Sequence, residues 1–228
     1  MISWEKLPPQ MQTEAVKPYY EILQKKQIGL IFKRLFDIVV SLIMLLILSP
    51  VFLVLAIAIK LDSKGPVFYR QVRVTQYGKE FRIFKFRTMV NNADKIGSQV
   101  TVGGDNRITR VGKVIRGCRL DEIGQLLNIL GGSMTFVGTR PEVPKYVEKY
   151  TSEMWATLLL PAGVTSEASI RYKDEAALLD VAEDVDATYI QDVLPGKMKY
   201  NLRSIQEYSF FKDIETMFQT IFAVVEKD

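Results

Sequence analysis

Two adjacent carboxylates, Asp121 and Glu122, are the residues of this sequence best suited to chemistry. Four cations lie close to them along the chain: Arg110, Lys113, Arg116 and Arg140. Magnesium takes one or two protein carboxylates and completes its shell with phosphate oxygens and water, and arginine pairs well with phosphate. This combination favours a site that holds phosphate and a divalent metal. Acidic residues in the first turn of a helix also complement the helix dipole, so a structural role is the alternative.

The composition limits which chemistry is available. The chain has 228 residues, no histidine and a single cysteine, Cys118. These counts exclude serine–histidine and cysteine–histidine nucleophile pairs, histidine-ligated zinc and an internal disulfide. Catalysis must therefore use carboxylates, lysine, arginine, hydroxyl groups or a metal held by oxygen atoms. The net charge of +4 suits an anionic partner, whether a membrane surface, a nucleotide or a nucleic acid.

A short helix is expected to hold the two carboxylates. Leucine and isoleucine recur at helical spacing over residues 120–130, and the glycines at 131 and 132 end the pattern. Asp121 and Glu122 then fall in the first turn of this helix.

A β-hairpin is expected earlier in the chain. Residues 67–74 and 81–86 are rich in β-branched and aromatic side chains, and a turn around Gly78 separates them. The alternation slips at Ile83 and Phe84, which indicates a bulge. The hairpin is strongly basic: Arg70, Arg73, Lys79, Arg82, Lys85 and Arg87. Most of these side chains fit a solvated or headgroup-facing surface. The alternative is a nucleic-acid site, in which bases stack on the aromatic side chains. Because no other segment resembles a nucleic-acid module, no nucleic-acid partner is expected.

Residues 38–59 form an uncharged apolar run. As a straight helix it would extend about 33 Å, enough for the hydrocarbon core of a bilayer. Ser49 and Pro50 lie at its middle, where proline removes a backbone hydrogen bond and the serine hydroxyl can bond to a freed backbone group. Basic residues flank both ends: Lys33, Arg34, Lys60 and Lys64. Because the positive-inside rule then favours neither end, we expect a helix–break–helix hairpin that enters and leaves on one face, rather than a single spanning helix.

The remaining pattern divides the chain into three parts. Residues 1–28 lack the features of a signal peptide and are expected to remain as an N-terminal extension. Residues 29–62 form the re-entrant membrane helix, and 63–228 a soluble domain with interfacial helices. In residues 214–225 an apolar stripe either covers the core, which we favour, or lies in the membrane interface. The expected class is α/β and mostly helical: a re-entrant membrane hairpin plus a small soluble domain with a short antiparallel sheet.

Eight short motifs occur in a fixed order: K-R-x-x-D (33–37), S-P (49–50), G-P-V-F-Y-R-Q-x-R (65–73), F-K-F-R-T-M (84–89), D-x-R-I-T-R-V-G (105–112), R-x-x-x-L-D-E (116–122), Q-L-L-N-I-L-x-G (125–132) and G-x-R-P (138–141). Each is modest alone, but the ordered set is specific. From about residue 32 to residue 222 the sequence resembles the bacterial sugar transferases, the monotopic polyprenyl-phosphate phosphoglycosyl transferases that start membrane glycan assembly.

The resemblance implies an enzyme of polysaccharide or glycoconjugate biosynthesis. It implies transfer of a phosphosugar from a UDP-sugar to polyprenyl (undecaprenyl) phosphate, with release of UMP. Asp121 would be the nucleophile that forms an aspartyl-phosphosugar, and Glu122 would bind Mg²⁺ together with Asp121. The residues implied to bind substrate are Lys85, Arg116, Arg140 and Pro141. The soluble domain would lie on the cytoplasmic face of the bacterial inner membrane.

The expected partners are the UDP-sugar, polyprenyl phosphate and the lipid bilayer. A homodimer is a further alternative for the oligomeric state. Two alternatives are a membrane-anchored protein that only binds a nucleotide sugar, and a glycosyl transferase that releases UDP. The sequence also departs from the family pattern at two prolines. The usual D-E-L-P-Q reads D-E-I-G-Q at 121–125, and the usual G-P-R-P reads G-T-R-P at 138–141.

Overall fold

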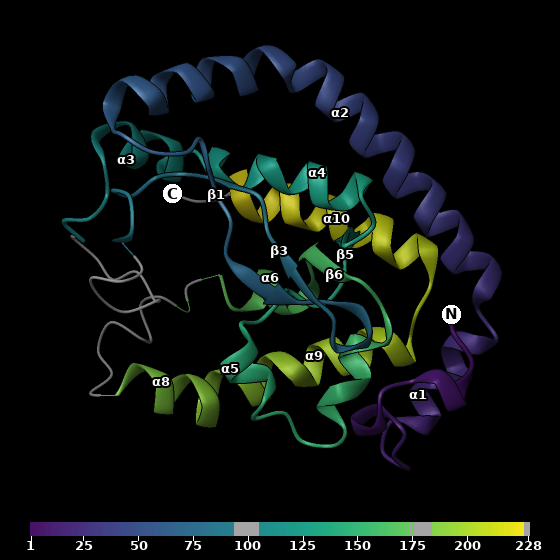
Figure 1. The fold of residues 1–228 in the computed structure, drawn as a ribbon. Coiled ribbons are helices and arrows are strands. Elements are labelled where there is room, and N and C mark those ends of the chain that lie inside the picture. The colour runs from purple at the N-terminus through teal and green to yellow at the C-terminus, as the bar shows by residue number, and fades with distance from the viewer. Residues whose placement is uncertain (94–104, 174, 176–183, 226–228) are drawn as a thin grey trace.

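The computed structural model describes residues 1–93, 105–173, 175 and 184–225. In this part of the chain helices predominate and the strands are short, as expected (Figure 1). The α-helices are α1 (Lys17–Gln24), α2 (Gln27–Asp62), α3 (Arg110–Gly117), α4 (Leu126–Leu130), α5 (Pro144–Val147), α6 (Glu167–Arg171), α8 (Val185–Thr188), α9 (Leu194–Gln206) and α10 (Phe210–Val225). The strands are β1 (Phe68–Tyr69), β2 (Val72–Val74), β3 (Glu80–Arg82), β4 (Lys85–Phe86), β5 (Met134–Val137) and β6 (Ala162–Thr165). Shorter 3-10 helices span Trp4–Lys6, Pro9–Met11, Gln76–Gly78, Leu120–Gln125 and Met154–Leu159, and a π-helical turn spans Tyr189–Val193.

The expected β-hairpin is present and is divided into two short ladders. β2 pairs with β3, and β1 pairs with β4, both antiparallel. The chain reverses at Tyr77 and Gly78, whose φ values of 59° and 70° suit a tight hairpin turn. The ladder is interrupted at Ile83 and Phe84, as the slipped alternation predicted. The amide of Phe84 donates instead to Oδ1 of Asn128 at 2.7 Å.

A parallel pair of strands, β5 and β6, was not predicted. All four residues of β5 are buried, so no alternation of polar and apolar side chains marks it as a strand. Gly138, directly after β5, lies against Gly163 of β6, and a Cβ on Gly163 would collide with the backbone of Gly138. Glycine is therefore required for this close approach.

The helix expected over residues 120–130 consists of two pieces. The 3-10 helix Leu120–Gln125 carries Asp121 and Glu122 in its first turn, as predicted, and α4 continues from it. Arg119, with φ of 53°, turns the chain into this segment from α3. Gly132, with φ of 84°, follows its end, in agreement with the expected glycine stop.

The long helix α2 differs from the expected hairpin. It is one continuous helix of 36 residues that contains Pro50, and it arches around one side of the body (Figure 1). The expected break into two helices at Ser49 and Pro50 is therefore absent from this structure. Pro50 has no N–H to give to the carbonyl of Leu46, but the Ser49 hydroxyl donates to that carbonyl at 2.8 Å. Because the freed carbonyl is satisfied in this way, the helix bends without ending.

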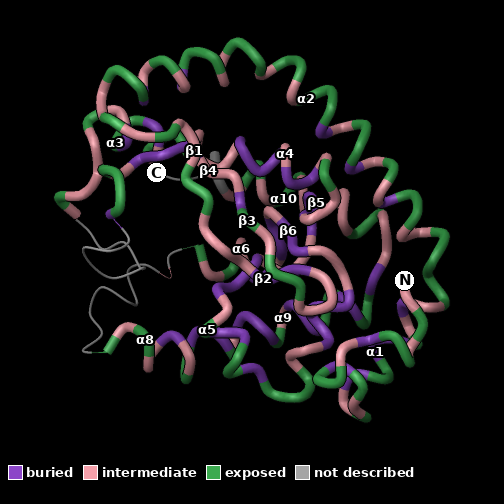
Figure 2. The backbone as a smooth tube through the Cα atoms, in the orientation of Figure 1, coloured by how far each residue is buried: buried purple, intermediate pink, exposed green. Residues whose placement is uncertain are grey.

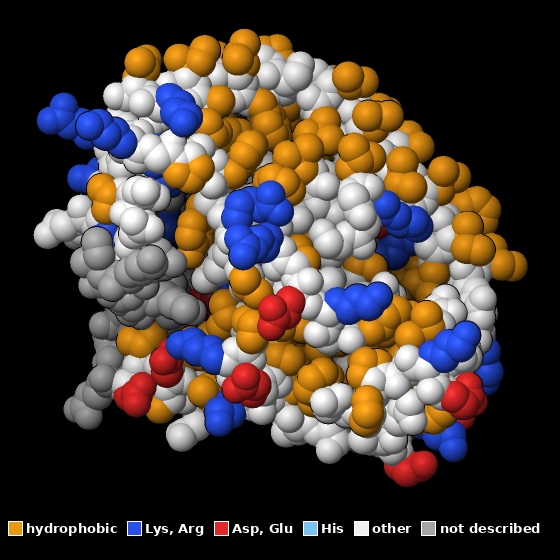
Figure 3. All heavy atoms as spheres, in the orientation of Figure 1, with side chains coloured by type: hydrophobic (Ala, Val, Ile, Leu, Met, Phe, Trp, Pro, Cys, Tyr) orange, Lys and Arg blue, Asp and Glu red, His pale blue; other side chains and the backbone are white. Residues whose placement is uncertain are grey.

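Both ends of α2 bond to the same body. Near its start, Lys33 Nζ lies 2.5 Å from Asp213 Oδ2 of α10. At its end, Arg87 donates to the carbonyl of Ser63 at 2.8 Å. Between these ends many large apolar side chains are exposed, and they form the apolar outer arc in Figure 3. Among the described residues, α2 is the one helix long and apolar enough to cross a membrane.

The N-terminal extension is part of the hydrophobic core. Leu7, Met11, Val16 and Leu23 are buried in one cluster with side chains of α9 and of the 3-10 helix Met154–Leu159 (Figure 2). The division into three domains stays a prediction. The first and third of these parts nevertheless share one core.

The apolar stripe of α10 is divided between the hydrophobic core and the exposed surface. Met217 packs against a buried cluster beneath α4 and β5, which agrees with the favoured core assignment. Phe218, Ile221 and Phe222 are exposed on the same helix. The side chain of Val225 lies outside the described residues. The core assignment therefore holds for only part of the stripe.

Candidate active site

Glu122 is held by two cations from distant parts of the chain. Lys85 of β4 donates to Glu122 Oε1 at 3.0 Å, and Arg140 Nη2 pairs with the same oxygen. Arg140 Nη1 also donates to the carbonyl of Val164 in β6, at 3.2 Å. Burial raises the pKa of Glu122, but Arg140 and Lys85 outweigh burial and hold that pKa well below its usual range. Glu122 is therefore an ionised anchor between the hairpin and the parallel strand pair.

Asp121 has a different environment, although it is the next residue. It is half-buried, and no other side chain among the described residues bonds to its carboxylate. Burial raises the pKa of Asp121 above the ordinary value of 3.8; the charge of Lys85 opposes this shift and the charge of Glu122 adds to it. A carboxylate that no other side chain bonds keeps lone pairs available for a substrate or a metal.

Asp121 lines a cavity of about 420 Å³. The other charged side chains that line it are all cations: Arg70, Arg73, Lys85, Arg87, Arg107 and Arg116. Three aromatic side chains also contribute: Phe68, Tyr69 and Phe86. We call this space the cationic cavity. Its charge favours an anionic ligand, and its volume lies in the range of small-molecule sites.

Two contacts hold the 3-10 helix Leu120–Gln125 and the adjoining α4 against the hairpin. Asn128 accepts from the amide of Phe84 and donates to the carbonyl of Arg82 at 3.1 Å. Gly124 lies so close to the hairpin that a Cβ at this position would be 2.9 Å from the carbonyl oxygen of Phe84. The glycine thus permits the approach that brings Glu122 within reach of Lys85.

Comparison with known proteins decides the family. The family model described as bacterial sugar transferase matches residues 28–227, which is most of the chain. The chain belongs to this family. The sequence-based expectation of a bacterial sugar transferase is confirmed.

Curated relatives of this sugar transferase chain carry related names. It is 36% identical to the UDP-N-acetylgalactosamine-undecaprenyl-phosphate N-acetylgalactosaminephosphotransferase of Aeromonas hydrophila, over 83% of this chain and 42% of the relative. It is 37% identical to the UDP-glucose:undecaprenyl-phosphate glucose-1-phosphate transferase of Klebsiella pneumoniae, over 86% and 40%. It is 30% identical to the exopolysaccharide production protein ExoY of Sinorhizobium fredii, over 93% and 90%. The chain therefore spans about two fifths of the first two relatives and most of the third.

The fold of this sugar transferase chain brings together most of the residues that the resemblance implied. Five of them meet at the cationic cavity or directly behind it: Lys85, Arg116, Asp121, Glu122 and Arg140. Pro141 is buried and does not line the cavity, and its carbonyl accepts a hydrogen bond from Arg73 at 3.0 Å. Ser49 and Pro50 lie in α2 and are exposed. The roles of all these residues stay predictions.

Sequence reasoning missed several cations of the site. Arg73, Arg87 and Arg107 line the cationic cavity but were not singled out for binding. The interpretation as a solvated surface fits Arg82, which is exposed, but not Arg87, which is buried and donates to carbonyls at the end of α2. Arg73 and Arg107 both belong to the set of motifs that occur in a fixed order along the sequence. This membership was the sequence feature that could have marked them as residues of the site.

The site fits a magnesium ion that takes few protein ligands. In the described part of the chain, no group of three or more His, Cys, Asp or Glu side chains is placed to hold a metal. Asp121 offers a carboxylate that no other described side chain bonds, whereas the oxygens of Glu122 are shared with Lys85 and Arg140. Magnesium commonly binds through one or two carboxylates plus substrate phosphates and water, and these donors suit that mode.

Proposed function

We propose that the chain is a phosphoglycosyl transferase, which transfers a phosphosugar from a UDP-sugar to polyprenyl (undecaprenyl) phosphate. The products are the polyprenyl-diphosphate-linked sugar and UMP. One observation carries the proposal: among the described residues, Asp121 is the one carboxylate that lines a cavity otherwise charged only by arginine and lysine. A diphosphate is attracted into such a cavity, and a nucleophile is already present at its wall. The names of the relatives describe the same class of donor and acceptor.

The reaction proceeds in two displacements at one phosphorus atom. An oxygen of the Asp121 carboxylate attacks the phosphorus that carries the sugar, the bond from this phosphorus to the bridging oxygen breaks, and UMP leaves with that electron pair. An oxygen of polyprenyl phosphate then attacks the same phosphorus. The bond to Asp121 breaks and the carboxylate is regenerated. Dividing one difficult transfer into two steps in this way is the advantage of covalent catalysis.

The cations neutralise the charge that these steps concentrate. Lys85 and Arg116 line the cavity beside Asp121, so they suit contact with the phosphates. Arg140 reaches the same region through Glu122, and its position suits the nucleotide part of the donor. Asp121, with Glu122 beside it, would hold Mg²⁺, which would neutralise phosphate charge when bound.

We further propose that the chain is monotopic and lies on the cytoplasmic face of the bacterial inner membrane. In support, Lys33 and Arg87 bond the two ends of α2 to one body, while the apolar middle of the helix is mostly exposed. A straight spanning helix would put its ends on opposite sides of the bilayer, about 30 Å apart. A bent helix that enters and leaves on one face keeps both sets of bonds. UDP-sugars are supplied in the cytoplasm, which places the body there.

The released nucleotide tests the proposal against its alternatives. The purified chain in detergent is mixed with undecaprenyl phosphate and a panel containing UDP-glucose, UDP-galactose and their N-acetylamino forms. Release of UMP with formation of a diphosphate-linked sugar supports a phosphoglycosyl transferase. Release of UDP would instead identify a glycosyl transferase. Binding of UDP-sugars without any release across the panel would identify a non-catalytic binding protein.

A further inference from the structure

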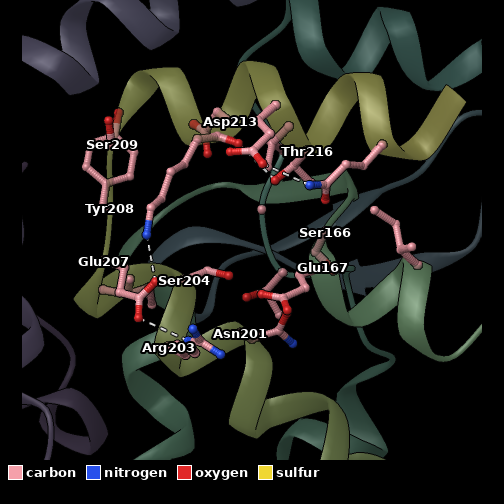
Figure 4. Close-up of a pocket in the computed structure, with 18 of the residues that line it drawn as sticks. Ser166, Glu167, Asn201, Arg203, Ser204, Glu207, Tyr208, Ser209, Asp213 and Thr216 are labelled. Carbon is pink, nitrogen blue, oxygen red and sulfur yellow. Dashed lines mark hydrogen bonds and ion pairs between the residues drawn. The ribbon is translucent and has the colours of Figure 1, made fainter. Parts of the chain in front are cut away.

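A second cavity lies between α6, α9 and α10, and its volume is about 760 Å³. In Figure 4, Asp213 and Thr216 of α10 lie above this space, Asn201 and Ser204 of α9 lie below it, and Ser166 lies beside it. It shares no lining residue with the cationic cavity. We call it the α9–α10 cavity. The two cavities are therefore lined by different parts of the chain.

The charges that line the α9–α10 cavity balance, and most of them are paired with one another. Lys33 pairs with Asp213 at 2.5 Å. Arg203 and Lys212 both pair with Glu207, at 3.0 Å and 2.7 Å. This balance contrasts with the cationic cavity, where the cations outnumber the one carboxylate. A strongly charged ligand such as a nucleotide gains little here, because the cations and the carboxylates in the wall are equal in number.

Neutral polar side chains and apolar side chains share the rest of the wall. Seven hydroxyl side chains line the cavity: Thr139, Thr157, Ser166, Ser204, Tyr208, Ser209 and Thr216. Two amides, Asn201 and Gln219, add both donors and acceptors.

Two buried residues in the wall have unused hydrogen-bonding capacity. Asn201 is 4% exposed and Tyr208 is 5% exposed, and both line the cavity. Oδ1 of Asn201 and the hydroxyl oxygen of Tyr208 have no hydrogen-bond partner among the described residues. Buried polar atoms are usually satisfied by protein, water or a ligand, so these two atoms are unsatisfied polar groups in residues that line the cavity.

We propose that the α9–α10 cavity binds a neutral saccharide. A sugar carries hydroxyl groups that both donate and accept, so it matches a wall of hydroxyls and amides with balanced charge. The volume falls in the usual range for small-molecule sites. Thr139 lines the cavity, and the next residue in the chain, Arg140, bonds to Glu122. The proposal rests on the residues that line the cavity and does not depend on the proposed transferase activity.

Saturation-transfer difference NMR on the purified full-length chain in detergent tests the proposal. The probes are D-glucose, D-galactose, N-acetylglucosamine and N-acetylgalactosamine, each without UDP. At least one should show saturation transfer. Ser204→Phe, which fills the cavity from α9, should weaken the transfer at least fivefold. Lys199→Phe is the matched control, because Lys199 is exposed on α9 and does not line the cavity.

Three results would overturn the proposal. The first is absence of saturation transfer from all four sugars to the wild-type chain. The second is a signal that persists in Ser204→Phe, or that UDP displaces, since UDP displacement would assign the sugar to the donor site. The third is binding of dihexanoyl phosphatidylethanolamine in place of the sugars, lost in Ser204→Phe, which would assign the cavity to a lipid headgroup. If Ser204→Phe does not fold by circular dichroism, Gln219→Trp fills the cavity from the exposed side of α10 and gives the same reading.

Discussion

Lys85 Nζ lies 3.0 Å from Glu122 Oε1 at the wall of the cationic cavity, and the charge of Lys85 also lowers the pKa of Asp121. One lysine thus acts on two adjacent carboxylates whose surroundings differ. Glu122 is bonded to two cations and its pKa is well below the usual range, whereas burial raises the pKa of Asp121. Titratable neighbours whose environments push their pKa values apart commonly have different roles. This asymmetry favours Asp121 as the nucleophile and Glu122 as the fixed charge beside it.

Asp121→Asn should abolish the covalent step while leaving the fold intact, because an amide cannot form the acyl phosphate. Wild-type protein given UDP-sugar without acceptor should release UMP in a stoichiometric burst and gain the mass of a phosphosugar. The variant should show neither, with turnover reduced about a thousandfold or more. Intact-protein mass spectrometry and rapid-quench assays measure both. Asp192→Asn, an exposed aspartate, is the control. Turnover of Asp121→Asn within about tenfold of wild type would rule out the covalent role.

Glu122→Gln should lower thermal stability, because it leaves Lys85 and Arg140 partly buried without their counter-charge. The side chain of Glu122 is 23% exposed, so the loss should be about 2 kcal/mol, or about 4–8 °C in Tm. Differential scanning fluorimetry of the chain in detergent measures the shift. Glu21→Gln, on the exposed surface of α1, should change Tm by no more than about 2 °C. An unchanged Tm in Glu122→Gln would mean that the pair contributes nothing to folding.

The UMP burst should lose rate on acidification at a higher pH than an ordinary aspartate would give. Burial raises the pKa of Asp121 above 3.8, so the carboxylate binds its proton at higher pH and the nucleophilic form is lost earlier as the pH falls. Arg116 lowers that pKa, so Arg116→Gln should move the acidic limb of the normalised burst rate to still higher pH. A limb at or below 3.8, or a downward shift in the variant, would contradict this assignment.

Local patterns were sufficient to predict the elements that carry Asp121 and Glu122, the pair of adjacent carboxylates that we call the dyad. The hairpin, its interruption at Phe84 and the glycine end of the segment at Gly132 follow from alternation and turn residues, and the structure contains all three. The dyad itself was visible because Asp121 and Glu122 are adjacent and acidic. These features depend on neighbours in sequence, and sequence patterns report such neighbours.

Features that depend on distant contacts were not predictable in the same way. The pairing of β5 with β6 requires the close approach of Gly138 and Gly163, which no periodicity reveals. Arg87 is buried because it donates to carbonyls at the end of α2, far away in sequence.

The expected break at Pro50 was wrong for a local reason: the Ser49 hydroxyl satisfies the freed carbonyl, so the helix continues.

The N-terminus should stay on the cytoplasmic side even when the proline bend is removed. Replacing Ser49 and Pro50 with leucine lets residues 38–59 form a straight helix of about 33 Å, long enough to span. The bonds at the start of α2 oppose this change, since Lys33 pairs with Asp213 at 2.5 Å and would have to release it. The leucine variant alone should therefore keep both termini inside. Adding Lys33→Leu removes the restraint and should let the N-terminus cross in a fraction of molecules.

Cysteine labelling from outside intact cells measures this topology. Cys118 is replaced by Ser, and Glu5→Cys supplies an exposed thiol in the N-terminal extension. A membrane-impermeant maleimide should leave Glu5→Cys unlabelled in the otherwise wild-type chain and in the leucine variant, and label it in part once Lys33→Leu is added. Lysed cells, in which all three should react, are the control.

Residues 1–28 also contribute Leu7 and Met11 to the core, so crossing requires this packing to open as well, and only a fraction should cross. Labelling of the wild-type background from outside would overturn the monotopic arrangement and establish a helix that spans the bilayer.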